Sequence, residues 1–161
     1  MIRYLFFILP LIVLAGCQQP SLKAETHEAP SSFAIVKGNG LLMVKTGEKS
    51  CMLADDAIDY EVYPSPNGDA LAVETLMMSN LQIVRLYRKT PKGCFRRISP
   101  PFAVQLWNRV RETTGYSIED IEHPRMKFLK WISTNKLEVE IMGESDRGNI
   151  DLNVTYSLQP F

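Results

Sequence analysis

The sequence is poor in the residues from which many metal and enzyme sites are built. Its 161 residues include two histidines and three cysteines, and it contains no motif for a phosphate loop, a zinc protease, an EF-hand or an α/β-hydrolase elbow. Basic and acidic side chains number 18 each, so no excess of positive charge favours nucleic-acid binding. We therefore expect no catalytic residues, no cofactor, no metal site and no nucleic-acid partner.

The amino terminus has the pattern of an export signal. Arg3 precedes an apolar run from Tyr4 to Leu14, which is shorter than the roughly 20 residues that cross a membrane as a helix. A positive residue before such a run is typical of a secretory signal peptide. Directly after it, Leu14-Ala15-Gly16-Cys17 resembles the lipobox of bacterial lipoprotein precursors. Residues 1–16 are therefore predicted to be a lipoprotein signal peptide.

The lipobox resemblance implies a lipid anchor on Cys17. In that family the signal peptide is cleaved before the cysteine, whose sulfur then carries a diacylglyceryl group and whose new amino group carries a further acyl chain such as palmitate. Each buried methylene contributes about 0.8 kcal/mol, so two or three chains anchor a protein stably in membrane lipid. Gln18 stands where an aspartate favours inner-membrane retention. In a host with two membranes, this implies the outer membrane, with the protein facing the periplasm.

Two cysteines remain, Cys51 and Cys94. In an exported protein they predict one disulfide, with two free thiols or a redox pair as the alternatives. A redox pair usually has the C-x-x-C spacing, which these two lack. Residues 17–32 are polar, contain prolines and lack an apolar period, so they are predicted to be a flexible tether behind the lipid.

Residues 33–161 are predicted to form a single β-rich periplasmic domain. Its predicted fold class is mainly β (α+β), with antiparallel sheets of meander hairpins and one helix near 101–113 packed on them. The helix follows from a four-residue apolar spacing, with Ser99 as its cap and Gly115 as its stop. A connection is expected from Gly143 to Asn149. Alternating or β-branched runs predict strands at 33–37, 41–46, 50–54, 60–63, 71–75, 81–88, 94–98, 128–132, 137–141 and 150–156.

A weak internal repeat divides this domain. Residues 60–88 and 127–158 share a layout of strand, turn, strand, loop and strand. The turn Ser65-Pro66-Asn67-Gly68 in the first stretch is similar to the repeat of periplasmic β-propeller blades. A closed propeller needs at least about four blades, which this length does not supply. We therefore predict a three-stranded meander that is used twice.

The densest polar cluster consists of Glu119, Asp120, Glu122 and His123. Carboxylates beside an imidazole are able to hold a cation or perform acid–base chemistry. The cluster lies between Gly115 and a proline, in a predicted loop, where such charges are usually only solvated. The spacing of Asp55, Asp56 and Asp59 does not fit a calcium loop, because the later ligands are missing.

A second cluster is basic and surrounds one predicted hairpin. On adjacent strands these side chains would form a positive rim, suited to anionic lipid headgroups, lipopolysaccharide phosphates or an acidic protein. The alternative is an edge hairpin that charge protects against aggregation. The residues are Arg85, Arg88, Lys89, Lys92, Arg96 and Arg97.

These patterns predict a membrane-anchored envelope lipoprotein that acts as a non-catalytic binding, accessory or structural component. Membrane lipid would hold its acyl chains, and an envelope protein would be its partner. The alternative is a small periplasmic enzyme with a carboxylate and histidine site near 119–123.

Overall fold

The computed structural model describes residues 33–159, so the predicted signal peptide and tether lie outside the described residues. The described chain is mainly β, with antiparallel sheets and one α-helix packed against them, as the sequence predicts. Its elements are β1 (Ala34–Gly38), β2 (Leu41–Thr46), β3 (Lys49–Ala54), β4 (Asp59–Pro64), β5 (Ala70–Met78), β6 (Leu81–Lys89), β7 (Phe95–Arg97), α1 (Phe102–Thr114), the short 3-10 helix η1 (Ile118–Asp120), β8 (Glu122–Ser133), β9 (Lys136–Ser145) and β10 (Gly148–Ser157).

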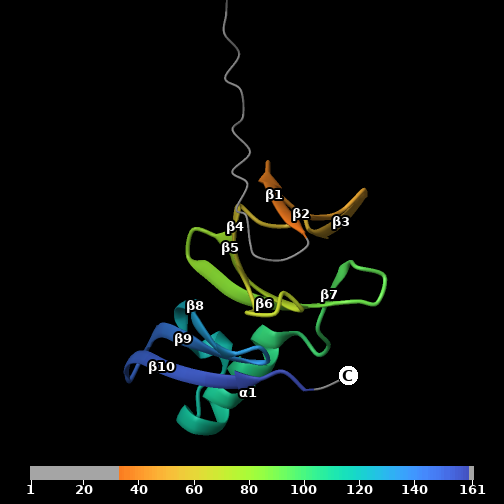
Figure 1. Ribbon diagram of the computed structural model, residues 1–161. Coiled ribbons are helices and arrows are strands. Elements are labelled where there is room, and N and C mark those ends of the chain that lie inside the picture. Colours follow the sequence, from red (N-terminus) through yellow and green to blue (C-terminus); the bar gives the residue numbers. More distant parts are fainter. Residues whose placement is uncertain (1–32, 160–161) are drawn as a thin grey trace, which may run out of the picture.

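The strands form three successive antiparallel groups, which lie one above another in Figure 1. The first group is the separate sheet of β1, β2 and β3. In the second, β5 pairs with β4 and β6, and β7 adds to the other edge of β6. The third is β8, β9 and β10, which joins β6 through one parallel pair, Gln82 with Arg125. Two of the groups contain the repeated meander that the sequence predicts.

β5 lies at the centre of the molecule because both of its faces are covered. Leu71 and Val73 belong to a core with the β1–β3 sheet, while Ala70 and Ala72 belong to a second core with β8–β10 and α1. Successive side chains of a strand point to opposite faces, so a strand with both faces covered needs a continuous apolar run. This explains why the sequence of β5 does not alternate as that of β9 does.

Cys51 and Cys94 connect the first two groups of strands. Their sulfur atoms lie 1.95 Å apart, at disulfide distance, and their Cα atoms are 5.8 Å apart, which fits the predicted bridge. Cys51 is in β3, and Cys94 directly precedes β7. The link therefore holds the edge of the first sheet to the hairpin of β6 and β7.

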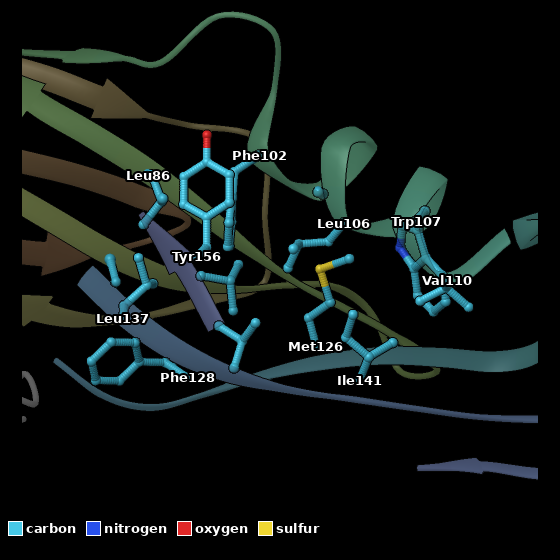
Figure 2. Packing of buried hydrophobic residues seen from close by; sticks show 14 of the residues in the cluster. Leu86, Phe102, Leu106, Trp107, Val110, Met126, Phe128, Leu137, Ile141 and Tyr156 are labelled. Atoms are coloured by element: carbon cyan, nitrogen blue, oxygen red, sulfur yellow. The ribbon is translucent and has the colours of Figure 1, made fainter. Parts of the chain in front are cut away.

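Helix α1 packs its apolar stripe against the second core. Phe102, Leu106 and Val110 are fully buried, and Figure 2 shows Leu106 directed toward Met126 of β8. The helix ends as predicted at Gly115, whose φ of 81° is left-handed and whose N–H donates to the Arg111 carbonyl.

The predicted cap of α1 is wrong. The N-cap is Pro101, without a side-chain cap bond, and Ser99 lies two residues before that N-cap. Pro101 has an extended ψ of 134°, so the helical backbone begins only at Phe102. The two prolines, which have no N–H to be capped, move the start of the helix beyond the reach of the Ser99 hydroxyl.

The predicted connection from Gly143 to Asn149 is also wrong, because β9 continues to Ser145 and β10 begins at Gly148. Gly143 is a strand residue opposite Ile150. A Cβ added there would lie 2.3 Å from Ile121 Cγ2, so this glycine permits a close approach rather than a turn.

A buried carboxylate links the two meanders. Glu74 of β5 is only 7% exposed. Its Oε1 accepts a hydrogen bond from the Phe128 N–H of β8, and its Oε2 accepts one from Gln82 Nε2 at 2.8 Å. The Phe128 N–H lies beside a register shift in the pairing of β8 with β9, where Glu74 supplies an acceptor.

We expect Glu74→Gln to change how stability depends on pH. Burial raises the pKa of Glu74 above its ordinary value, so folding favours the protonated carboxyl. The stabilisation from this group is present below about pH 4.5, the unfolded value, and is lost as pH rises through the raised folded value. In urea unfolding, wild type should therefore lose stability relative to Glu74→Gln between pH 5 and pH 8. The control is Glu48→Gln in the exposed β2–β3 turn, and an equal change in both variants would contradict the prediction.

Candidate anion-binding groove

An open groove of about 650 Å³ lies between the β6–β7 hairpin, the amino-terminal end of α1 and the end of β10. In Figure 1 the segment that follows β10 approaches the loop between β7 and α1, and residues of both segments line the groove. Among the described residues, the lining contains three arginines and no acidic side chain. The lining residues are Arg88, Thr90, Pro91, Arg96, Arg97, Ile98, Ser99, Pro100, Gln105, Tyr156, Leu158 and Gln159.

Arg88 and Arg96 lie directly opposite each other in the β6–β7 ladder. Opposed residues of an antiparallel pair project from the same face, with Cβ atoms about 5 Å apart, and like charges in this arrangement are destabilising. Arg97 pairs with Tyr87 one position along the ladder and also borders the groove.

The start of α1 adds further positive potential to the groove. The first turn of the helix holds no acidic side chain, and its N-cap makes no side-chain hydrogen bond. The positive end of the helix dipole is therefore not offset by a local carboxylate. Gln105 Nε2 donates to the Pro100 carbonyl at 2.7 Å, which fixes the loop that leads into the helix.

Tyr156 of β10 lies at the boundary between the groove and the second core. Its ring packs edge-on against Phe102, with centroids 4.8 Å apart, and its hydroxyl donates to Gln105 Oε1 at 2.9 Å. Figure 2 shows this hydroxyl pointing away from the buried side chains of the core. The Arg109 guanidinium lies 5.4 Å from the ring centroid, so a fourth arginine is held beside the groove.

The end of the described chain runs along the same groove. The Leu158 N–H donates to the Asn135 carbonyl at 2.7 Å, and Arg88 Nη1 donates to the Gln159 carbonyl. These bonds give Arg88 a defined position and leave Leu158 buried at the wall.

Sequence reasoning missed Gln105, Arg109 and Tyr156. The first two are four residues apart on α1 and therefore share a helix face, which is a signal that the sequence carries. The position of Tyr156 depends on how β10 packs against the helix, and no local pattern predicts that contact.

Arg85 does not belong to the predicted positive rim. It is 4% exposed and forms two hydrogen bonds with Asp56, at 2.6 and 2.9 Å. Arg85 shares its face of β6 with Tyr87, and that face is covered by the β1–β3 sheet. Alternation along the strand therefore places Arg85 on the opposite face from Arg88.

The other predicted rim residues also separate. Lys89 borders an adjoining hollow of about 370 Å³ together with Asn67, Asp69 and Arg88. Lys92 is exposed in the β6–β7 turn. The structure thus places Arg88 and Arg96 on one face of the β6–β7 hairpin, beside the groove. Arg97, opposite Tyr87, belongs to the other face and only borders the groove, and the other three basic side chains lie outside it.

The predicted acidic and histidine cluster is exposed and lies outside the groove. Glu119 and Asp120 are in η1, where the Ser117 hydroxyl hydrogen-bonds both carboxylates, and the bond to Glu119 lowers the pKa of that carboxyl. Glu122 and His123 begin β8, so the predicted loop is instead a 3-10 helix followed by a strand. Across residues 33–159, no group of three or more metal-binding side chains occurs.

We expect Arg96→Gln to stabilise the fold while weakening its affinity for anions. Removing one of two opposed charges should raise the free energy of unfolding by about 0.5 kcal/mol at low salt. The gain should disappear in high salt, because screening weakens the repulsion in wild type. Denaturant unfolding at two salt concentrations measures this effect. Lys92→Gln in the same hairpin is the matched control, and an equal gain there would contradict the prediction.

No protein-family model, curated protein or solved structure matches this chain. In the part of the chain that the structure describes, no helix has the length and apolar character needed to span a membrane.

Proposed function

We propose that this chain is a lipid-anchored envelope protein whose β-rich domain binds an anionic partner and performs no catalysis of its own. The observation that carries the proposal is the groove bordered by Arg88, Arg96 and Arg97, whose described lining residues include no acidic side chain. Arginine presents a planar set of donors that matches carboxylate and phosphate groups.

The lipobox supports attachment through Cys17, and Gln18 supports an outer-membrane position facing the periplasm. The polar segment 17–32 would connect the lipid to the domain. Cys17→Ser should release the protein from the membrane fraction or leave its signal peptide uncleaved. Membrane retention of a processed Cys17→Ser protein would contradict the anchor.

The groove is tested in intact cells by a photocrosslinking amino acid at Gln159. Gln159 is exposed and lines the groove. Its backbone carbonyl accepts the hydrogen bond from Arg88, so replacing its side chain leaves that bond in place. We expect an adduct whose yield falls at least fivefold in the double variant Arg96→Glu with Arg97→Glu. A matched charge reversal on the β2–β3 hairpin, Lys45→Glu with Lys49→Glu, should leave the yield unchanged. Equal yields in wild type and the Arg96 and Arg97 variant would mean that these charges only protect an edge hairpin.

A further inference from the structure

Strand β10 lies at an edge of the larger sheet, where among the described residues it pairs with β9 alone (Figure 1). It is ten residues long, and its register with β9 runs without a shift from Gly148 to Ser157. It contains no lysine, arginine or proline, and Asp151 is its one charged residue. Native proteins usually prevent unwanted pairing at an edge by a short strand, a lysine, a proline or a bulge. β10 has none of these features.

The other edge strands each have at least one such feature. β7 is three residues long and contains Arg96 and Arg97, and β1 is five residues long and contains Lys37. β4 ends in Pro64. β3 begins at Lys49, and its pairing with β2 contains a register shift. The long and regular edge of β10 therefore differs from every other edge in the described chain.

The backbone of β10 directs alternate N–H and C=O groups away from β9. The Leu158 N–H, one residue beyond the strand, donates to the Asn135 carbonyl at 2.7 Å and continues the ladder with β9. Bonded positions in an antiparallel ladder alternate, so the even-numbered residues of β10 bond to β9 and the odd-numbered residues face outward. The Thr155 carbonyl agrees with this assignment, because it accepts from Arg109 of α1 at 3.3 Å.

The outward backbone groups of Asp151 and Asn153 remain open to a further strand. Both residues are exposed, and among residues 33–159 no hydrogen bond reaches these outward groups. A row of open donors and acceptors along an edge is a template for pairing with another chain.

We propose that β10 pairs antiparallel with β10 of a second copy of this chain, about a twofold axis at Leu152. In this register Asp151 lies opposite Asn153 of the partner copy on both sides of the axis, and each pair exchanges two backbone hydrogen bonds. The interface is isologous, since the same residues serve on both copies. It does not use the arginines of the groove, so this function is separate from the proposed one.

Charge favours this register over its neighbours. The Asp151 carboxylate and the Asn153 amide of the partner copy project from one face of the joined sheet, where the amide is able to donate to the carboxylate. An axis at Asp151 would place two carboxylates directly opposite each other, which is destabilising. An axis at Asn153 would bring Asp151 to the Thr155 carbonyl, which already accepts from Arg109.

The other side of β10 adds apolar contacts to the pairing. Leu152 and Val154 are only partly buried where they pack against the second core, beside the buried Ile150. About the proposed axis, Leu152 lies opposite its own counterpart, and Ile150 lies opposite Val154 of the partner copy. These are the non-hydrogen-bonded positions, at which opposed side chains are closest. The polar and the apolar pairs are both self-complementary, which favours a second copy over an unrelated strand.

Sedimentation of the full chain in neutral detergent tests the dimer. Wild type should show a monomer–dimer equilibrium as the protein concentration rises. Asn153→Asp places two carboxylate pairs opposite each other across the axis and should raise the dimer dissociation constant at least fivefold. Adding Asp151→Asn exchanges the two side chains and should restore the wild-type value.

Asn149→Asp is the matched control for Asn153→Asp. Both changes place an aspartate opposite a glutamate of β9, Glu144 or Glu140, so they have similar effects within one copy. In the proposed register, position 149 faces Thr155 of the partner copy and no acidic residue. The dissociation constant of Asn149→Asp should therefore equal that of wild type.

Cysteine cross-linking in intact cells tests the register. Leu152→Cys should form a disulfide-linked dimer on oxidation, because opposed non-hydrogen-bonded positions lie within the Cα distance that a disulfide spans. We expect a yield at least fivefold above that of Glu112→Cys, an exposed position on α1 that reports random collision. Cells that express Asp151→Cys and Asn153→Cys together apply the same test at exposed positions. Circular dichroism checks that each purified variant is folded.

Three results would overturn the inference. Wild type that stays monomeric at every concentration would remove the dimer. Equal dissociation constants for Asn153→Asp and Asn149→Asp, with a Leu152→Cys yield no higher than that of Glu112→Cys, would place a dimer contact elsewhere. A cross-link from Leu152→Cys to a different protein, without a linked homodimer, would identify a partner of other sequence at this edge.

Discussion

Replacing Cys51 and Cys94 together by alanine should lower the free energy of unfolding by about 4 kcal/mol. The two residues are 43 positions apart, and a cross-link over that distance restricts the unfolded chain much more than the folded one. The link also joins β3 to the segment before β7, so its loss frees the β1–β3 sheet from the β6–β7 hairpin. Denaturant unfolding under non-reducing conditions measures the change in free energy.

A reducing agent provides the internal control for this prediction. It should destabilise wild type by a similar amount and leave the double alanine variant unchanged. If the reductant has the same effect on both proteins, the stabilisation comes from packing around the sulfur atoms and not from the cross-link.

The architecture is predictable from the sequence because most strands have one wet face. β9 alternates buried and more exposed residues, as its sequence does, and its neighbours pair with it in the antiparallel order that a meander requires. The glycine at 115 ends α1 because the positive φ there is intrinsic to that residue type. These features depend on local chemistry.

The layering of the sheets is not predictable in this way. The sequence of β5 does not predict that one face of the strand packs against the β1–β3 sheet and the other against α1. Each of these cores is built from segments that are far apart in the sequence. Gly143 shows the same difficulty. A glycine beside turn-forming residues predicts a turn, and only the packing of the distant Ile121 against Gly143 explains why a glycine stands within a strand.

The candidate groove was predicted only in part. The hairpin that carries Arg88 and Arg96 follows from the sequence, and so does the concentration of positive charge around it. The wall opposite is supplied by α1 and β10, which are distant in the chain. The prediction placed Arg85 in the positive rim because it grouped basic residues by their distance along the sequence. Successive residues of a strand point to opposite faces, and the register of β6 places Arg85 on a buried face.

That buried face gives Arg85 a structural role. Its guanidinium is held by the Asp56 carboxylate, and the Asp56 N–H in turn donates to the Tyr60 hydroxyl at 2.9 Å. The pair fixes the connection between β3 and β4 onto β6. A third bond runs from Arg85 Nη2 to Met77 Sδ at 3.0 Å, so the guanidinium is enclosed on more than one side.

Asp56→Ala should therefore lower the free energy of unfolding by about 2 kcal/mol, because it leaves a buried guanidinium without its charged partner. We expect less than the 3–5 kcal/mol or so of a fully buried pair, since the Asp56 side chain is 51% exposed. Asp55→Ala, which changes the exposed neighbouring carboxylate, is the matched control and should have little effect. Arg85→Met combined with Asp56→Ala should recover much of the loss, because no unpaired charge then remains in the core.

The dependence on pH gives a second test of the same pair. The hydrogen bonds from Arg85 lower the pKa of Asp56 below its ordinary value of 3.8. A carboxyl with a lowered folded pKa stabilises the protein above the unfolded value, and that stabilisation is lost as pH falls through the folded value. The difference in unfolding free energy between wild type and Asp56→Ala should thus be constant from pH 7 to pH 5 and shrink below about pH 4. A difference that stays constant down to pH 2 would show that Asp56 acts through packing and not through its charge on Arg85.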